Sequence, residues 1–435
     1  MSDSIAQLRA SDAGQAGQTN SSTALTQRYL GIRSLSERMA SPLTAEDCAM
    51  QTMPDVSPTR WHLAHTTWFF EVFLLKNRPG YKLFDPEYEQ LFNSYYNAVG
   101  QPFPRHRRGQ LSRPGLSEIL AYRRHVDEAV TGLLEGQTLQ PSEWDVLQLG
   151  MQHEQQHQEL ILTDIKHVFF SNPLQPAYQA ALSPWPSCSA SAMRWAHVEE
   201  GVFEIGYQGS GFAYDNERPR HRTLVQSHSL ASRCVTNGEY LEFIDDDGYS
   251  RPELWLSLGW AQLVEQRWMA PLYWVSRDQR WHEFTLAGLT PLNREQPVCH
   301  ISYFEADAFA RWADRRLPTE FEWEAAASAE NAPGVFADKL LAGQMPIHPQ
   351  VQTEEEAAGL LGNVWQWTSS HYSPYPRYRA AAGALGEYNG KFMCNQFVLR
   401  GGSCATSSDH IRATYRNFFP PETRWQFSGI RLARD

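Results

Sequence analysis

A histidine pair in the pattern His-Glu-x-x-His at residues 153–157 is the part of this sequence best suited to chemistry. The surrounding segment 151–166 is expected to be helical, because it contains good helix formers and neither proline nor glycine. Residues four apart share one face of a helix, so the imidazoles of His153 and His157 can reach one metal ion. Two solvated histidines on a polar helix face are the alternative interpretation, and the pattern alone leaves it open.

A metal site needs more than two ligands, and the segment 61–65 offers two further histidines. His62 and His65 are three apart on a second predicted helix, so both can face roughly one way. Three neutral imidazoles with open coordination positions suit a catalytic metal rather than a closed structural one. Ligand type does not separate iron from zinc. For His62, a hydrogen bond to the backbone is an alternative to metal binding.

The elements that would position these histidines form a predicted helical bundle. Helices are expected at residues 25–40, 58–75, 116–134 and 142–170, from the spacing of apolar residues and from capping signals. Four such helices with long connections are typical of a four-helix bundle, which holds metal ligands on its inward-facing positions. The connection 84–113 has a weak helical pattern, and loops of this length inside a compact domain are usually functional.

The character of the sequence changes near residue 171. Prolines cluster between residues 173 and 186, and from residue 193 onward short strands and turn residues dominate, with helices expected at 236–246 and 303–315. The predicted division is a disordered tail at 1–23, a metal-binding helical bundle at 24–172, a linker at 173–192 and a second domain at 193–435. The fold class is therefore expected to be α+β.

Composition limits the classes of function. The chain has 435 residues, and its net charge of -11 without a basic block argues against nucleic-acid binding. No apolar run approaches the ~20 residues of a membrane span, and the N-terminus lacks the layout of a signal peptide. The 6 cysteines show no metal-binding or disulfide spacing. A reducing cytoplasm and small-molecule partners are expected, and the oligomeric state is left open.

Four ordered motifs occupy the second half of the chain. They are Arg-Leu-Pro-Thr-Glu-Phe-Glu-Trp-Glu at 316–324, Gly-Asn-Val-Trp-Gln-Trp at 362–367, Arg-Gly-Gly-Ser at 400–403 and Gly-Ile-Arg-Leu-Ala-Arg at 429–434. This series resembles the formylglycine-generating-enzyme (sulfatase-modifying factor) fold, which is similar to a C-type-lectin-like domain. Most of these residues are interpreted as core: Trp365 and Trp367 should pack, and Glu320 should pair with Arg431.

Formylglycine-generating enzymes use a cysteine pair after the Gly-Gly-Ser motif. Here only Cys404 follows it, and Asp409 and His410 stand where a partner is expected. The thiol–copper chemistry of those enzymes is therefore not expected.

A DinB-like four-helix bundle followed by such a domain resembles the ergothioneine-biosynthesis sulfoxide synthases. The resemblance implies that His65, His153 and His157 bind iron(II) and that His62 does not. It implies an O2-dependent carbon–sulfur bond between the imidazole of hercynine (N-α-trimethylhistidine) and the thiol of cysteine or γ-glutamylcysteine, with oxidation of the sulfur to a sulfoxide.

The same resemblance implies substrate-binding residues. Gln156 and Asn417 match positions that hold hercynine, and Phe418 or Phe419 would face its quaternary ammonium in a cation–π contact. Arginine side chains bind carboxylates with two parallel hydrogen bonds. The arginines available for the thiol substrate in the long connection are Arg105, Arg107, Arg108 and Arg113. Neither the sequence nor the resemblance selects among them.

Tyr95 and Tyr96 are the predicted catalytic residues. The mycobacterial-type enzymes place a catalytic tyrosine in the C-terminal domain, where Tyr388 is out of register. A second branch of the family has a Tyr-Tyr pair in the long connection of the bundle, and this chain resembles that branch. A phenol with a pKa near ~10 is a suitable proton donor. Two packing tyrosines are the alternative.

Other functions remain open from the sequence. A selenoneine synthase would join a seleno-sugar to hercynine on the same architecture, whereas an ovothiol synthase usually carries an extra methyltransferase domain. A zinc metalloprotease would use His153, Glu154 and His157, but metzincins need a third histidine at position 163, where this chain has Thr163. A lectin-like binding module would hold no redox metal.

Overall fold

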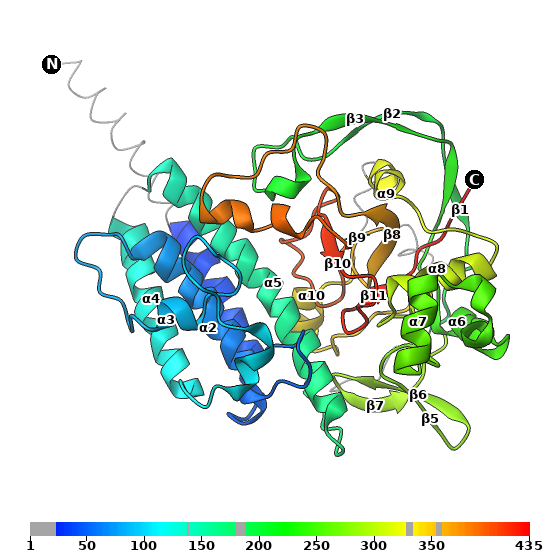
Figure 1. The fold of residues 1–435 in the computed structure, drawn as a ribbon, viewed down its shortest axis with the longest axis horizontal. Coiled ribbons are helices and arrows are strands. Elements are labelled where there is room, and N and C mark those ends of the chain that lie inside the picture. The colour runs from blue at the N-terminus through cyan, green and yellow to red at the C-terminus, as the bar shows by residue number, and fades with distance from the viewer. Residues whose placement is uncertain (1–22, 137–138, 180–187, 328–333, 354–358) are drawn as a thin grey trace. The chain divides into compact units, whose positions relative to one another are not determined.

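A computed structural model describes residues 23–136, 139–179, 188–327, 334–353 and 359–435 (Figure 1). Nearly all of the expected tail at 1–23, and part of the expected linker at 173–192, lie outside the described residues. The chain forms two compact units, Met1–Ile161 and Leu162–Asp435, called unit 1 and unit 2 below. The point of division lies inside a helix, so the domain bounds given above stay a prediction.

Unit 1 contains the four predicted helices. Residues 23–40 are helical, α2 spans Thr59–Phe70 and continues as a π-helix at Glu71–Leu75, α4 spans Leu116–Gly136 and α5 spans Pro141–Ser171. The last ten residues of α5 belong to unit 2. Every residue of α2 except Arg60 is buried, so this helix is the centre of the bundle. A β-carbon on Gly150 would lie 2.5 Å from Phe70, which shows how closely α5 approaches α2.

The long connection of unit 1 has only short helical turns. They are α3 at Tyr88–Leu91 and a 3-10 helix at Arg105–Gln110. Between them, the Asn93 side chain donates to the carbonyls of Tyr96 (2.9 Å) and Gly100 (3.1 Å) and accepts from the Tyr96 amide (3.0 Å). One buried amide side chain therefore fixes the turn that carries Tyr95 and Tyr96.

The described residues of unit 2 form four small sheets rather than one large one. Their orders are β1-β4-β12, β10-β9-β8-β11, β2-β3 and β5-β6-β7. The strands are β1 Trp195–Val198, β2 Gly201–Ile205, β3 His221–Val225, β4 His228–Ala231, β5 Trp274–Arg277, β6 Arg280–Thr285, β7 Gly288–Pro291, β8 Trp365–His371, β9 Phe397–Arg400, β10 Asn417–Phe419, β11 Ser428–Gly429 and β12 Ala433–Arg434. All pairs are antiparallel except β11 with β8.

The described part of unit 2 has more helices than the two expected. The expected segments 236–246 and 303–315 become α6 at Asn237–Asp245 and α8 at Tyr303–Trp312, each with a capping box. The additional helices are α7 at Ser257–Gln266, α9 at Glu320–Ala327 and α10 at Ala337–Ala342. The start of helix α9 is marked in the sequence by a capping box. Thr319 accepts from the Glu322 amide (3.1 Å), and Glu322 accepts from the Thr319 amide (2.7 Å).

The motifs of unit 2 form its core, with one correction to the expected pairing. Trp365 and Trp367 are buried, as expected. Glu320 does not pair with Arg431; it accepts from Arg400 (2.9 Å) and Arg416 (2.8 Å). The Arg431 guanidinium instead donates to three oxygens, those of the Gln366 side chain and of the Ala231 and Gly359 carbonyls. Spacing along the chain could not distinguish these arginines, because their partners lie far from them in the sequence.

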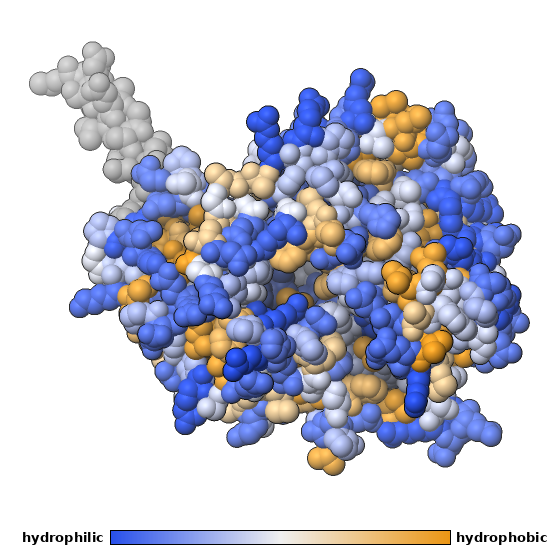
Figure 2. All heavy atoms as spheres, viewed as in Figure 1, coloured by the Kyte–Doolittle hydropathy of each residue, from blue (hydrophilic) through white to orange (hydrophobic). Residues whose placement is uncertain are grey.

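The surface is mixed in character. On the face drawn in Figure 2, hydrophilic residues cover most of the surface and hydrophobic residues form small groups. Among the described residues, no helix is both long enough and apolar enough to cross a bilayer.

Candidate metal centre

The structure brings together the side chains of His65 from α2 and of His153 and His157 from α5. Each offers a ring nitrogen, and the three nitrogens lie within 4.8 Å of one another. All three rings are buried within unit 1, with His157 the most exposed at 9%. This distance is short enough for one ion to contact all three rings, and three protein ligands leave coordination positions for substrates.

The His65 ring is held in an orientation that suits metal binding. Its Nδ1 lies 2.7 Å from the Phe92 carbonyl oxygen, which requires a hydrogen on Nδ1 and leaves the lone pair on Nε2. That Nε2 is buried and has no hydrogen-bond partner. Trp61 and Trp68 both stack on the ring, at centroid distances of 4.6 and 5.4 Å. A buried acceptor without a donor is costly unless a cation occupies the site.

The three histidines are neutral at neutral pH. Burial lowers the pKa of His65 and of His157 well below the usual range, and the neighbouring His153 adds to both shifts. Burial also lowers the pKa of His153 to about 3. Neutral imidazoles are the form that binds metals, so the residues present fit a divalent ion.

His62 lies beside the centre rather than apart from it. It is buried, and its Nδ1 lies 2.8 Å from Nδ1 of His157. A hydrogen bond at Nδ1 of His157 would leave its opposite nitrogen, Nε2, available to an ion. His62 therefore matches the description of an outer partner that orients a ligand, a role that the sequence did not suggest.

Glu154 points away from the centre and is part of a separate buried network. Its carboxylate accepts from Arg33 (2.7 Å), Arg123 (2.9 Å) and Ser36 (2.7 Å). Burial alone would raise the pKa of Glu154, but the two guanidinium groups lower it to about 2. A carboxylate bound to two arginines is a poor general base. This geometry argues against the zinc-protease interpretation, in which that glutamate activates water.

Glu154→Gln is expected to destabilise unit 1 by about 3–5 kcal/mol, because it leaves Arg33 and Arg123 buried without their shared carboxylate. The measurement is urea unfolding of the metal-free protein. The carboxylate has an unfolded pKa of about 4.3 and a lower native one, so its contribution is present above that pH and is lost as pH falls toward 2. The variant should therefore lose part of the acid sensitivity of the wild type.

Glu143→Gln is the matched control, since this glutamate sits in the first turn of the same helix in a partly exposed ion pair with Arg78. It should cost less than about 1 kcal/mol. A Glu154→Gln protein with unchanged stability and lost activity would instead indicate a general base.

Tyr95 and Tyr96 lie against the aromatic wall of the centre. Their hydroxyl oxygens are 3.4 Å apart and their rings stack at 4.5 Å. Tyr96 is fully buried and packs at 5.6 Å against Trp68, whose ring also stacks on His65. The pair is thus one aromatic ring away from a candidate ligand.

The four arginines of the long connection differ in their surroundings. Arg105 and Arg107 are exposed. Arg108 is buried with its guanidinium 3.3 Å above the Trp61 ring, and it donates to Ser57 and Ser94, both at 2.9 Å. Arg113 is exposed but lines a small cavity together with Arg108.

Arg60 of α2 lines the same cavity, and the sequence did not single it out. Partial burial lowers the pKa of Arg60, and the charge of Arg113 adds to the shift. Crowded cations beside a cavity favour an anionic ligand. The available signal was the position of Arg60 immediately before Trp61, on the helix that carries His65.

The expected hercynine residues are divided between the units. Gln156 is half-buried on α5 in unit 1. Asn417, Phe418 and Phe419 form β10 in unit 2, where Phe418 stacks on Tyr372 at 4.0 Å. Their role in binding stays a prediction.

Comparison with known proteins identifies the family. Residues 29–161 match the DinB superfamily, and residues 183–339 and 343–435 match the sulfatase-modifying factor enzyme 1-like domain. A hercynine oxygenase of Mycolicibacterium thermoresistibile is 32% identical over 88% of this chain and 88% of that protein. One of Mycobacterium tuberculosis is 31% identical over 90% of this chain and 94% of that protein. The chain belongs to the hercynine oxygenase family.

Family membership confirms several expectations. The fold class is a DinB-type helical domain followed by a sulfatase-modifying factor domain, as predicted. The chain is an oxidoreductase, a hercynine oxygenase of ergothioneine biosynthesis. A formylglycine-generating enzyme of Streptomyces coelicolor is 28% identical over 60% of this chain, which agrees with the motifs of unit 2. The metalloprotease and binding-module interpretations are set aside.

Proposed function

We propose that this hercynine oxygenase is an iron(II)- and O2-dependent sulfoxide synthase that joins the thiol of cysteine or γ-glutamylcysteine to the imidazole of hercynine. The observation that carries the proposal is the set of three neutral, buried imidazoles whose nitrogens lie within 4.8 Å of one another. Bound there, iron(II) would supply open positions for a thiolate and O2 and the redox chemistry that joins them. His65, His153 and His157 would hold it.

The protein contributes orientation and exclusion of water. His62 and the Phe92 carbonyl fix the His157 and His65 rings through hydrogen bonds of 2.8 and 2.7 Å. Trp61 and Trp68 both stack on the His65 ring. Rigid ligands in a dry pocket hold reactants close together, which replaces an encounter of separate molecules.

Tyr95 and Tyr96 are proposed as proton donors, and the chain is proposed to belong to the branch of the family with a Tyr-Tyr pair. Asn93 holds their turn, and the two hydroxyls are close enough to exchange a hydrogen bond. Hercynine is proposed to be bound by Gln156 and by Asn417, Phe418 and Phe419. An aromatic contact with its quaternary ammonium would contribute about 0.5–2 kcal/mol.

The carboxylates of the thiol substrate are proposed to bind at the cavity lined by Arg60, Arg108 and Arg113. Arg108 is pre-organised by its contacts with Trp61 and two serines. Arg105 and Arg107 lie outside the lining of this cavity and are less suited to the role. We also propose a reducing cytoplasm, which is consistent with the free thiols of Cys48, Cys234, Cys299 and Cys394.

Arg113→Ala is expected to raise the KM for the thiol roughly tenfold to hundredfold, because a charge-assisted hydrogen bond contributes about 1.5–3 kcal/mol. The KM for hercynine should change little. Steady-state kinetics with each substrate varied in turn checks this, with Arg107→Ala as the exposed control from the same connection. Equal increases in both KM values would place the cavity outside the thiol site.

Mass spectrometry of products tests the proposed function. Hercynine, iron(II) and air are offered with cysteine, γ-glutamylcysteine or a seleno-sugar in separate reactions. A sulfoxide adduct with one of the thiols is the expected result. A product only with the seleno-sugar would show a selenoneine synthase instead.

A further inference from the structure

A second cluster of metal-binding side chains is buried in unit 2, where the proposed function does not use it. Glu283 on β6, Cys299 and His300 each offer a ligand atom, and these atoms lie within 4.8 Å of one another. His348 lies alongside, with its Nε2 3.5 Å from a Glu283 carboxylate oxygen. None of the four residues is more than 2% exposed. Charged groups that are buried in a protein are paired with one another or bind a metal.

The ammonium group of Lys166 lies beside this cluster. The Lys166 ammonium is fully buried, 2.7 Å from Nε2 of His300 and 3.7 Å from the Glu283 carboxylate. The rings of Tyr273 and Phe427 face it, at 4.8 and 5.0 Å. The surroundings of this point therefore attract positive charge from several directions.

Two residues at the cluster have a strained backbone conformation. His300 has φ 62° and Tyr273 has φ 78°, both in the left-handed region that bulky side chains seldom adopt. Their rings pack against each other at 4.7 Å. Strain of this kind persists only where the surrounding structure requires it, and it is concentrated at functional sites.

We propose that Glu283, Cys299, His300 and His348 form a second metal site that takes one zinc-class divalent ion. One thiolate, one carboxylate and two imidazoles are all ligand types that zinc binds, and four ligands would complete its tetrahedral coordination. The site lies wholly in unit 2 and contains sulfur, whereas the three-histidine centre of unit 1 contains none. The inference goes beyond the proposed function and does not depend on it.

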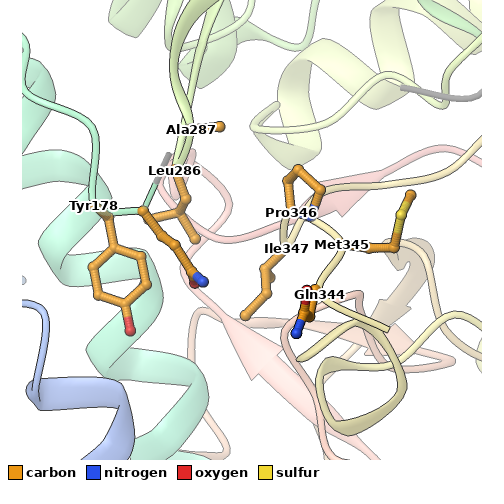
Figure 3. A pocket seen from close by; sticks show the side chains of 8 residues that line it. Tyr178, Leu286, Ala287, Gln344, Met345, Pro346 and Ile347 are labelled. Carbon is orange, nitrogen blue, oxygen red and sulfur yellow. The ribbon is translucent and has the colours of Figure 1, made fainter. Parts of the chain in front are cut away.

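A pocket is lined by residues that neighbour the cluster residues in the sequence (Figure 3). Its lining includes Ile347, which precedes His348, and Leu286, which follows the end of β6, the strand of Glu283. Tyr178 and Pro346 line it as well.

Cobalt(II) loading of the metal-free full-length protein tests the proposal. A thiolate ligand gives an intense sulfur-to-cobalt charge-transfer absorption in the near ultraviolet, and a site of three histidines cannot. With two equivalents of cobalt, the wild type should show this band and bind about two ions per chain. Absence of the band in the wild type would overturn the proposal without any variant.

Cys299→Ser should remove the band and reduce bound cobalt to about one ion per chain, the ion at the three-histidine centre. Cys234→Ser is the matched control, since Cys234 is another buried free thiol of unit 2, and it should keep the band. His348→Gln keeps the thiol, so it should still show the band. Because one ligand is lost, the band should need a higher cobalt concentration. A band that survives Cys299→Ser would assign the sulfur to another cysteine and contradict the site.

Discussion

Replacing His65, His153 or His157 with alanine is expected to abolish iron binding at micromolar iron and, with it, sulfoxide formation. Each ring supplies one of three nitrogens within 4.8 Å of one another, so two ligands would remain. Loss of an outer partner of a ligand typically costs 10–100-fold in metal affinity. Loss of a ligand itself should therefore cost more than about a hundredfold. Iron content after anaerobic loading and desalting measures this directly.

His62→Ala separates the ligands from their outer partner. This variant should bind iron about 10–100-fold more weakly and regain activity when iron is raised, because His157 keeps its Nε2 but loses the 2.8 Å contact at Nδ1. His125→Ala, on α4, should behave as the wild type. Full iron in His65→Ala together with lost iron in His62→Ala would show that His62 is the ligand.

Tyr95→Phe combined with Tyr96→Phe is expected to lower sulfoxide formation by about 10²–10⁴-fold, the usual contribution of a positioned general acid. Phenylalanine keeps the stacked rings and removes only the two hydroxyls, so iron and both substrates should still bind. Without timely proton delivery, thiol oxidation should proceed alone and yield sulfinic acid. Product ratios from mass spectrometry, with iron content measured in parallel, check both parts.

Single substitutions should have smaller effects, since the two hydroxyl oxygens are 3.4 Å apart and one can partly replace the other. Tyr88→Phe is the control. It removes a buried hydroxyl in the same connection, one that donates to Glu118 at 2.9 Å. Wild-type sulfoxide formation by the double variant would show that the tyrosines only pack and that the donor lies elsewhere.

Helical periodicity predicts part of the metal centre correctly. The His153–His157 pair follows from the four-residue spacing on a helix, and the structure places both rings in one cluster. Spacing could not choose between His62 and His65, because both lie on the inner face of α2. The choice rests on their partners, the Phe92 carbonyl for His65 and the His157 ring for His62. Partners from other elements cannot be read from one segment.

The surroundings of Glu154 were hidden for the same reason. Arg33 and Arg123 lie on two other helices, and the sequence near residue 154 contains no signal that predicts these partners. In unit 2, the same limit explains the wrong pairing of Glu320 with Arg431. Helix α9 is different, because its start at Thr319 and Glu322 was a local signal that could have been used.

Labelled dioxygen tests the central claim most directly. The protein is loaded with iron(II) without air, given hercynine and γ-glutamylcysteine or cysteine, and then exposed to ¹⁸O2. The predicted result is a sulfoxide adduct that carries the label. No adduct should form in the sample that is kept without oxygen. An unlabelled adduct, or the same yield when zinc replaces iron, would contradict the account.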